Sequence, residues 1–335
     1  MIADVVVDLQ YGDCGKGKIA HALCRENKYT HVIRYNGGCN AGHTIYHNGE
    51  KFVTHHIPCG VFFGVVSIIG PGCVVHVDTF LKEIQQLEEA GIPAKKLVRV
   101  ASNAHLITDF HRVEDGKDEN IGTTKRGNGP AYRDKYARKG VRALQDKRLQ
   151  PYIISMYHEL YENQEHKEIR ILFEGAQGFG LDVDWGDYPY VTSSHCTVGS
   201  ALLNGVPASA IRDVWGVAKI YETYVGAKSF EGTDEIFEDI RELGQEYGAT
   251  TGRPRQINWL DFDMLKMAAR INGCTKVVFN KMDILDAINK WCLYEGPNLY
   301  EFKSQDDIEM WLSGKLELEV NEDMEIIFSG DKEYI

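Results

Sequence analysis

Short runs of almost continuously apolar residues recur along the chain, and segments with apolar positions at helical spacing separate several of them. The runs occupy residues 5–7, 31–35, 65–69, 97–100, 169–173, 214–220 and 276–279, and the helical patterns are clearest at 19–25, 80–89 and 262–270. Unbroken apolar runs of this length are typical of strands buried on both faces of a sheet. Their alternation with helices predicts an α/β fold, with a mostly parallel central sheet and helices on both faces. In such sheets, ligands bind beyond the carboxyl ends of the strands.

The chain gives no sign of a boundary between domains. Its 335 residues contain no internal repeat, no low-complexity segment and no linker rich in proline and serine. We therefore expect residues 1–335 to form a single domain. The longest apolar stretch, at residues 61–69, is far too short to cross a bilayer, so we expect no membrane partner.

Composition narrows the classes of partner. Lys and Arg number 37 against 49 Asp and Glu, which gives a net charge of -12. That balance argues against nucleic acid or an anionic membrane as the main partner, although small phosphorylated ligands need only local positive charge. The 8 cysteines are scattered without a Cys-x-x-Cys pair, and no signal peptide is evident at the start. We therefore expect a reduced, cytoplasmic setting.

The first candidate site is a glycine-rich loop at residues 12–18, which follows an apolar run and precedes a helical pattern. Its backbone amides and the helix start after it can cradle an anion, and Lys16 and Lys18 add positive charge. Ile19 stands where a P-loop has the Ser or Thr that binds Mg²⁺. A metal would need another ligand, for which Asp13 is the nearest candidate. The alternative is a surface turn whose lysines serve solubility.

Three further segments carry polar groups in patterns that suit ligands. His43 follows a second glycine loop and is a candidate general acid, although a lone histidine is as readily structural. Thr123 and Thr124 precede a basic run at 125–142 that suits a phosphate monoester, or else is a solvated helix face. The turn at 250–255 holds two threonines and two arginines, which suit a bidentate carboxylate.

The sequence Asn280-Lys281-Met282-Asp283 comes directly after the apolar run at 276–279. The Asp283 carboxylate can accept hydrogen bonds from both N1–H and the 2-amino group of guanine, a pattern that adenine cannot satisfy. This placement predicts a guanine nucleotide as a ligand. Together with the glycine loop it would also suit a GTPase switch, but Ile19 is wrong for a P-loop GTPase.

Taken in order, these motifs resemble the adenylosuccinate synthetase family along nearly the whole chain. The matching stretches are residues 12–18, 40–44, 121–124, 129–132, 173–178, 188–194, 248–255 and 280–283. The resemblance implies a P-loop-like adenylosuccinate synthetase fold and a ligase that acts in two steps. GTP phosphorylates O6 of a 6-oxopurine nucleotide, and L-aspartate then displaces the phosphoryl group. ATP or dATP is the less favoured donor, and Mg²⁺ is the expected metal.

The same resemblance implies roles for individual residues. Asp13 would take the N1 proton, His43 would stabilise the leaving diphosphate as an acid, and Lys16 and Gln177 complete the expected catalytic set. Asp13 and the backbone carbonyl of Gly42 would hold Mg²⁺. The acceptor nucleotide site is expected at Asn40, Thr123, Thr124, Arg138, Gln177, Thr192, Val225 and Arg253. The aspartate site is expected at Thr250, Thr251, Arg253 and Arg255, and the donor site at Gly12, Cys14, Gly15, Lys16, Gly17, Lys18, Gly42, His43, Thr44, Lys281, Asp283, Ser329 and Gly330.

Two expectations concern the assembly and the acceptor. Arg138 is expected to reach the ligand of a neighbouring subunit, which implies a homodimer. The segments 8–11 and 195–197 look closer to the phage branch, so we expect dGMP as acceptor, in diaminopurine biosynthesis and in the host cytoplasm if the chain is viral. The alternative is IMP, in AMP biosynthesis, because Asp13 is retained where the best-known phage members have a smaller residue. A GTPase switch or a catalytically silent nucleotide-binding homologue is the alternative from another class.

Overall fold

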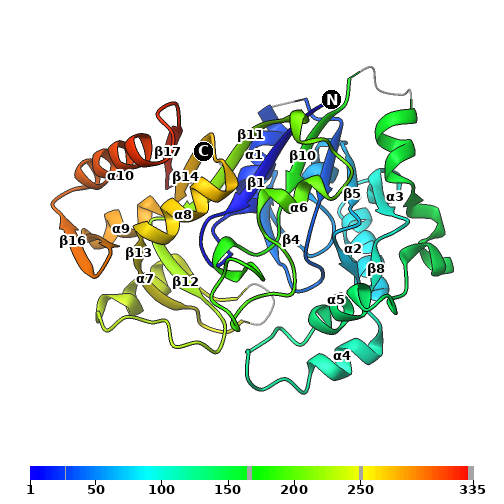
Figure 1. Ribbon diagram of the computed structural model, residues 1–335, viewed down its shortest axis with the longest axis horizontal. Coiled ribbons are helices and arrows are strands. Elements are labelled where there is room, and N and C mark those ends of the chain that lie inside the picture. Colours follow the sequence, from blue (N-terminus) through cyan, green and yellow to red (C-terminus); the bar gives the residue numbers. More distant parts are fainter. Residues whose placement is uncertain (27, 164–167, 249–251, 331–335) are drawn as a thin grey trace.

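The computed structural model describes residues 1–26, 28–163, 168–248 and 252–330. Its main feature is a nine-stranded sheet in which every pair of neighbouring strands is parallel (Figure 1). Across the sheet the order is β17 (Glu325–Ser329), β14 (Lys276–Asn280), β11 (Ile211–Lys219), β1 (Ile2–Asp8), β10 (Arg170–Glu174), β2 (His31–Arg34), β5 (Val66–Ile69), β7 (Val98–Ala101) and β9 (Ile153–Ile154). The prediction of a mostly parallel central sheet is confirmed.

The apolar runs form the interior of this sheet for a simple reason. Val5, Val6 and Val7 of β1 are all 0% exposed, because β10 and β11 flank the strand and helices cover it. Branched side chains such as these favour the extended backbone and pack well on a pleated surface. Because all nine strands run in one direction, their carboxyl ends share one edge, and the loops that follow them gather there.

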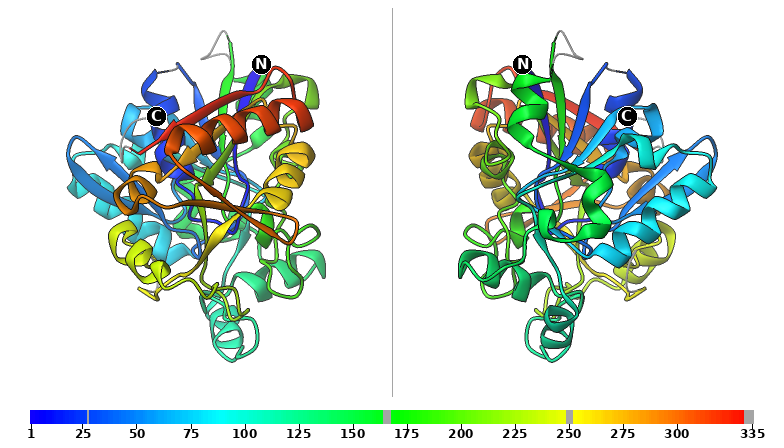
Figure 2. Two further views of the ribbon diagram at one scale, coloured as in Figure 1. Left: turned by 90° about the vertical axis from the view of Figure 1, so that its left-hand side faces the viewer. Right: turned by 90° about the vertical axis from the view of Figure 1, so that its right-hand side faces the viewer.

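Helices lie on both faces of the sheet (Figures 1 and 2). The helical patterns predicted at 19–25, 80–89 and 262–270 fall within α1, α2 and α8. Asp261 caps the start of helix α8 (Phe262–Asn272), its side chain accepting from the backbone N of Met264 at 3.1 Å, and Gly273, with φ of 62°, caps its end. The helices are α1 (Lys16–Glu26), α2 (Val77–Glu89), α3 (Ala94–Leu97), α4 (Asp109–Asp115), α5 (Asn128–Tyr136), α6 (Val198–Leu202), α7 (Ile236–Gly244), α8 (Phe262–Asn272), α9 (Met282–Ile288) and α10 (Gln305–Glu319).

Three smaller sheets complete the fold, and the sequence patterns did not predict them. The largest has four strands in the order β12 (Tyr221–Tyr224), β13 (Gln256–Asp261), β15 (Trp291–Glu295) and β16 (Asn298–Phe302). The others are the hairpin of β3 (His43–His47) with β4 (Glu50–Thr54), and the short pair β6 (Val74–Val75) with β8 (His105–Leu106). Because β12 follows β11 almost directly, the four-stranded sheet begins at the edge where the central strands end.

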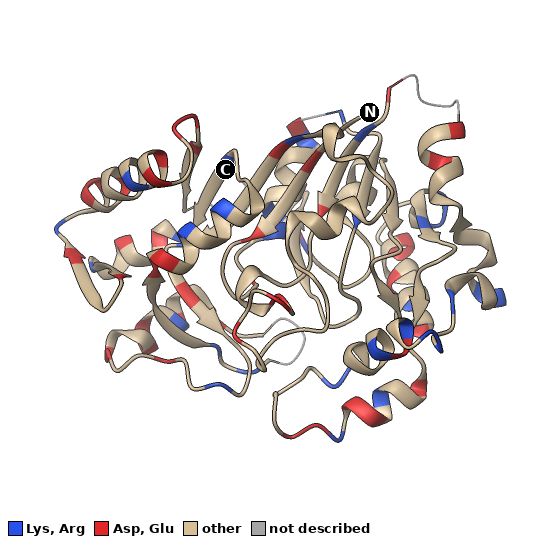
Figure 3. Cartoon of the chain, viewed as in Figure 1, with Lys and Arg blue, Asp and Glu red and all other residues tan. Residues whose placement is uncertain are grey.

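Charged residues of both signs are interspersed over most elements (Figure 3). In the basic run at 125–142, Arg133, Arg138 and Lys139 are exposed, as a solvated helix face would be. Within the described ranges, no helix is both long enough and apolar enough to cross a membrane.

Candidate active site

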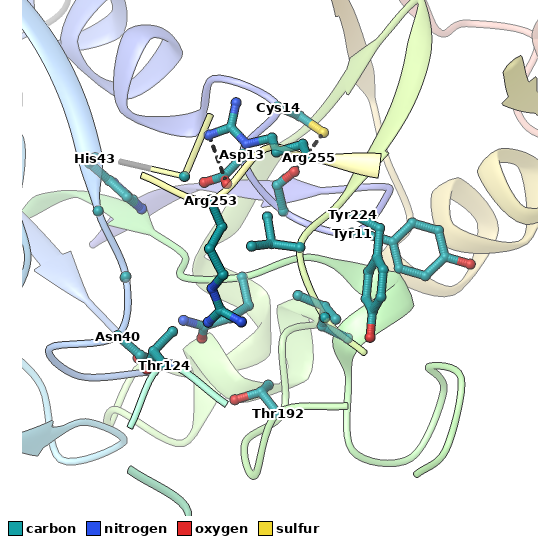
Figure 4. Close-up of a pocket in the computed structure, with 18 of the residues that line it drawn as sticks. Tyr11, Asp13, Cys14, Asn40, His43, Thr124, Thr192, Tyr224, Arg253 and Arg255 are labelled. Atoms are coloured by element: carbon teal, nitrogen blue, oxygen red, sulfur yellow. Dashed lines mark hydrogen bonds and ion pairs between the residues drawn. The ribbon is translucent and has the colours of Figure 1, made fainter. Parts of the chain in front are cut away.

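A cavity of about 1020 Å³ opens where the strands of the central sheet end (Figure 4). Its wall draws on every motif that the sequence singled out. The wall includes residues 11–18, 40–44, 121–124, 128–130, 190–193, 224–226, 243–245, 280–281 and 283–284, with single residues at 177, 219, 253, 255 and 330. A pocket for one small ligand typically measures some 300–1,000 Å³, so this cavity is at the upper end of that range.

The glycine loop at residues 12–18 is bonded to the last residue of β1, the strand that precedes it. Asp8, at the end of β1, is fully buried and accepts from the backbone N of Gly12 and of Cys14, both at 3.1 Å. It also pairs with Nζ of Lys16 at 2.9 Å. Gly12 has φ of 89°, a conformation in which a side chain would be strained. These contacts with Asp8 hold the loop in shape.

Lys18 joins this loop to the ends of two other strands. Its Nζ donates to Oδ1 of Asn280 and to Oγ of Ser329, both at 2.8 Å. The side chain of Asn280 in turn donates to the backbone O of Cys14 at 2.7 Å. The ends of β14 and β17 are thus fixed beside the loop. Of the predicted donor-site residues, the wall holds Gly12, Cys14, Gly15, Lys16, Gly17, Lys18, Gly42, His43, Thr44, Lys281, Asp283 and Gly330, and Ser329 contacts them through Lys18.

Asp13 and Arg255 form an ion pair inside the cavity, with Nη2 to Oδ2 at 2.9 Å (Figure 4). Asp13 has φ of 59°, which turns its side chain out of the loop. Burial alone would raise the pKa of its carboxyl, but Arg255, Lys219 and Lys16 hold that pKa below its usual value. Asp13 is therefore ionised at neutral pH, as a general base has to be.

The residues expected to bind Mg²⁺ offer suitable donors. The Asp13 carboxylate is ionised and its side chain is 36% exposed on the cavity wall, which Gly42 also lines. Mg²⁺ prefers oxygen ligands, and it is typically bound by one or two carboxylates together with substrate phosphates. A carboxylate and a backbone carbonyl beside a phosphate loop fit that preference.

His43 lies at the start of β3, buried between a carboxylate and a guanidinium. Its Nδ1 hydrogen-bonds to Oε1 of Glu174, and Nη1 of Arg34 donates to its Nε2 at 3.0 Å. Burial and the charge of Arg34 lower the pKa of His43 to about 4, against the opposing effect of Glu174. In this arrangement His43 is a neutral imidazole. With Nδ1 facing the carboxylate, Nε2 is the acceptor nitrogen, so it can donate only if Arg34 moves away from it and Nε2 gains a proton.

The predicted acceptor residues lie together on one side of the cavity, as Figure 4 shows for Asn40, Thr124, Thr192 and Arg253. Nη2 of Arg253 donates to the backbone O of Thr123 at 3.1 Å. Thr123, Gln177 and Val225 also line the wall. Oε1 of Gln177 is buried and, within the described part of the chain, has no hydrogen-bond partner.

Thr250 and Thr251 lie outside the described residues. Arg138 has φ of 62° at the end of α5, is exposed, and is not among the described residues that line the cavity. Its expected role across a subunit interface therefore stays a prediction.

The structure also brings in charged residues that the sequence patterns did not indicate. Asp8, Arg34, Glu174 and Glu246 are buried at 0–2% exposure, and each bonds to a residue of the cavity wall. Each stands alone at the end of an apolar strand or in a loop. The sequence offered one indication of such residues: a charged side chain next to an apolar run is expected to be buried, and a buried charge requires a partner.

Comparisons with known proteins agree with this geometry. A family model described as adenylosuccinate synthetase matches residues 5–146 and 144–296. The chain is similar to the adenylosuccinate synthetases of Chlorobium phaeobacteroides (38% identical over 86% of this chain and 78% of that protein) and Xanthomonas axonopodis pv. citri (39% over 85% and 78%).

Two solved structures share the fold. The fully ligated adenylosuccinate synthetase from Plasmodium falciparum has a TM-score of 0.85 at 28% identity, covering 98% of this chain and 97% of that one. The cyanophage S-2L succinoaminodeoxyadenylate synthetase PurZ, bound to dGMP and to dATP as energy donor, has a TM-score of 0.71 at 23% identity, covering 93% and 99%. At that identity the second likeness concerns the fold alone.

Proposed function

The chain belongs to the adenylosuccinate synthetase family, whose members are carbon–nitrogen ligases, and on that premise we propose that it joins L-aspartate to C6 of IMP at the expense of GTP. Family membership sets aside the GTPase switch, and the presence of both Asp13 and His43 argues against a catalytically silent homologue. Family membership also makes purine biosynthesis the setting. The 8 cysteines are free and buried, which supports a reduced, cytoplasmic location.

We propose IMP as the acceptor, in place of the dGMP that the sequence led us to expect, for two reasons. Relatives at 37–39% identity are named adenylosuccinate synthetase, whereas the dGMP-bound phage enzyme is 23% identical. In addition, Asp13 fills the position where the best-known phage members have a smaller residue that leaves room for a 2-amino group. An acceptor without a 2-amino group, such as IMP, therefore fits better beside Asp13 on the cavity wall.

The ion pair between Asp13 and Arg255 is the observation that carries the proposal. It places an ionised carboxylate and a guanidinium side by side, next to the loop that bears Lys16 and Lys18. The reaction needs these groups together: a base at the purine, a cation for the carboxylates of aspartate, and a site for the donor phosphates.

The residues then act in sequence. Asp13 accepts the N1 proton, so that O6 attacks the γ-phosphorus of GTP and the bond from that phosphorus to the bridging oxygen breaks. GDP leaves, with Lys16, Lys18 and the loop amides bound to its phosphates, and His43 acts as the acid at the leaving oxygen once Arg34 has moved from its Nε2 and that nitrogen carries a proton. Next, Arg255 and Arg253 orient L-aspartate, whose amine attacks C6. Inorganic phosphate leaves with the former O6, and the departing phosphate takes up the proton that the nitrogen loses as the C6–N bond forms.

Residues of the same cavity wall indicate where the donor nucleotide and the metal would bind. Lys281 and Asp283 at the start of α9 line the cavity beside Gly330, so we place the guanine base there. Mg²⁺, which Asp13 and the carbonyl of Gly42 would hold, supplies neutralisation of charge on the donor phosphates.

The test is aspartate-dependent release of phosphate from GTP with IMP, GMP or dGMP as acceptor. We expect kcat/KM for IMP to exceed that for dGMP by at least about tenfold, the discrimination that an enzyme typically achieves when two substrates differ by one small group. Mass spectrometry should identify the succinyl product. Preference for dGMP would reinstate the diaminopurine pathway, and phosphate release without any purine acceptor would contradict the ligase assignment.

A further inference from the structure

A buried carboxylate, Glu246, lies behind Arg255 and takes no part in the reaction described above. It is 0% exposed. Its Oε1 accepts from the hydroxyl of Tyr221 at 2.7 Å, and its Oε2 accepts from Nζ of Lys219 at 2.8 Å. Nη1 of Arg255 also donates to Oε2. Glu246 thus ties a residue of the cavity wall to β12 and to the end of β11.

The backbones of the two residues are joined as well. The N of Arg255 donates to the O of Glu246 at 2.9 Å, and the next pair inward, Tyr247 with Pro254, forms a bridge. Because Glu246 holds both the backbone and one end of the guanidinium, the side chain of Arg255 has little freedom to swing.

We propose that Glu246 is a positioning residue for L-aspartate, holding Arg255 so that its Nη2, beside Asp13 on the cavity wall, meets the substrate carboxylate. The inference rests on the proposed function. Nη2 of Arg255 is 2.9 Å from Oδ2 of Asp13, and its Nε is buried and has no hydrogen-bond partner within the described ranges. A guanidinium already fixed at Nη1 binds a carboxylate without the entropic cost of ordering a long side chain.

The charges along this row support the same role. They alternate in sign from Lys219 through Glu246 and Arg255 to Asp13. Burial would raise the pKa of Glu246, but Lys219 and Arg255 hold it at about 2, so the carboxylate is ionised. Without that anion, Arg255 would bind Asp13 more closely and offer less to a substrate carboxylate.

The test is Glu246→Gln, assayed by phosphate release with each substrate varied in turn. Loss of one charged hydrogen bond should raise KM for L-aspartate about tenfold, with kcat at saturating aspartate within about threefold of wild type and KM for GTP and IMP within about twofold. The control is Glu222→Gln, on β12. Glu222 is 3% exposed, and burial and nearby Asp261 raise its pKa well above its usual value, so the substitution matches Glu246→Gln at a buried carboxyl whose charged form is disfavoured. It should leave all three KM values at wild type.

A double-mutant cycle separates positioning from general damage. In an Arg255→Lys background, adding Glu246→Gln should change KM for aspartate by less than about twofold, because the guanidinium it orients is gone. If Glu246→Gln does not fold, Tyr221→Phe removes one hydrogen bond to the same carboxylate and should raise the same KM by about twofold.

Two results would overturn the inference: an unchanged KM for aspartate, or equal rises in KM for all three substrates. Both presuppose that the wild type releases phosphate only with aspartate present. If the wild type does not, the proposed function fails instead, so the two failures are distinguishable.

Discussion

Asp13 is the proposed general base, and the charged groups around it determine whether its carboxyl is ionised. Arg255, Lys219 and Lys16 keep it ionised. Replacing it with Asn preserves the shape but leaves no group to take the N1 proton. We expect Asp13→Asn to lower kcat by about 10² to 10⁴, the usual contribution of general base catalysis. Steady-state assays, with circular dichroism to verify folding, will measure this, and a kcat within about tenfold of wild type contradicts the role.

Asp283 is the residue on which the choice of donor depends. Its carboxylate can accept from two N–H groups of guanine, and an amide oxygen cannot replace both contacts. Asp283→Asn should therefore raise KM for GTP about tenfold to a hundredfold while kcat changes little. Asp286→Asn, at another exposed aspartate of the same helix, is the control and should have no effect. Equal KM values for the two variants would place the guanine elsewhere.

At the scale of elements, a buried ion pair joins the ends of two neighbouring strands. Oε1 of Glu174, at the end of β10, lies 2.9 Å from Nη2 of Arg34, at the end of β2. Glu174→Gln leaves that guanidinium buried without its anion, which should lower the free energy of unfolding by about 3–5 kcal/mol. Urea titration measures it. Glu168→Gln, which removes an exposed pair, should cost no more than about 1 kcal/mol, and similar losses for both would contradict the argument.

This element also predicts how stability depends on pH. The pKa of His43 is about 4, below its unfolded value of about 6.5, so as pH falls from 6.5 to 4 the unfolded state takes up a proton that the folded state lacks. Stability should fall through that window. Arg34 and His43 hold the pKa of Glu174 at about 2 against burial, so its contribution is lost below about pH 4.3. Urea midpoints at pH 7 and 5 should differ less in a His43→Gln variant than in wild type.

Most strands of the central sheet could be predicted, because a strand that is buried on both faces consists of an unbroken run of apolar residues. Strands β9 and β17, at the two edges of the sheet, were missed, since β9 has only two residues and only Ser329 in β17 is buried. The glycine loops, threonines and arginines of the site were also visible. Asp8, Glu174 and Glu246 were not, because their roles depend on long-range contacts such as Glu174 with Arg34, 140 residues apart.

At the scale of the whole molecule, the cavity wall runs from Tyr11 to Gly330, which supports our proposal of one domain over residues 1–335. Arg138 lies outside this wall, as the predicted action across a dimer interface requires. Mixing inactive Asp13→Ala with impaired Arg138→Ala should then restore about a quarter of wild-type activity, since half the dimers are mixed and each has one intact site. No gain on mixing would mean that Arg138 does not serve a neighbouring subunit.

The central claim is that phosphate leaves carrying the purine oxygen, and one labelling experiment tests it directly. IMP with oxygen-18 at position 6 would be incubated with GTP, Mg²⁺ and L-aspartate, and the released phosphate analysed by mass spectrometry. A 6-phosphoryl intermediate predicts that every phosphate carries one labelled oxygen and that no label appears without aspartate. Unlabelled phosphate, formed with an oxygen from water, would show that GTP is hydrolysed independently and would contradict the account.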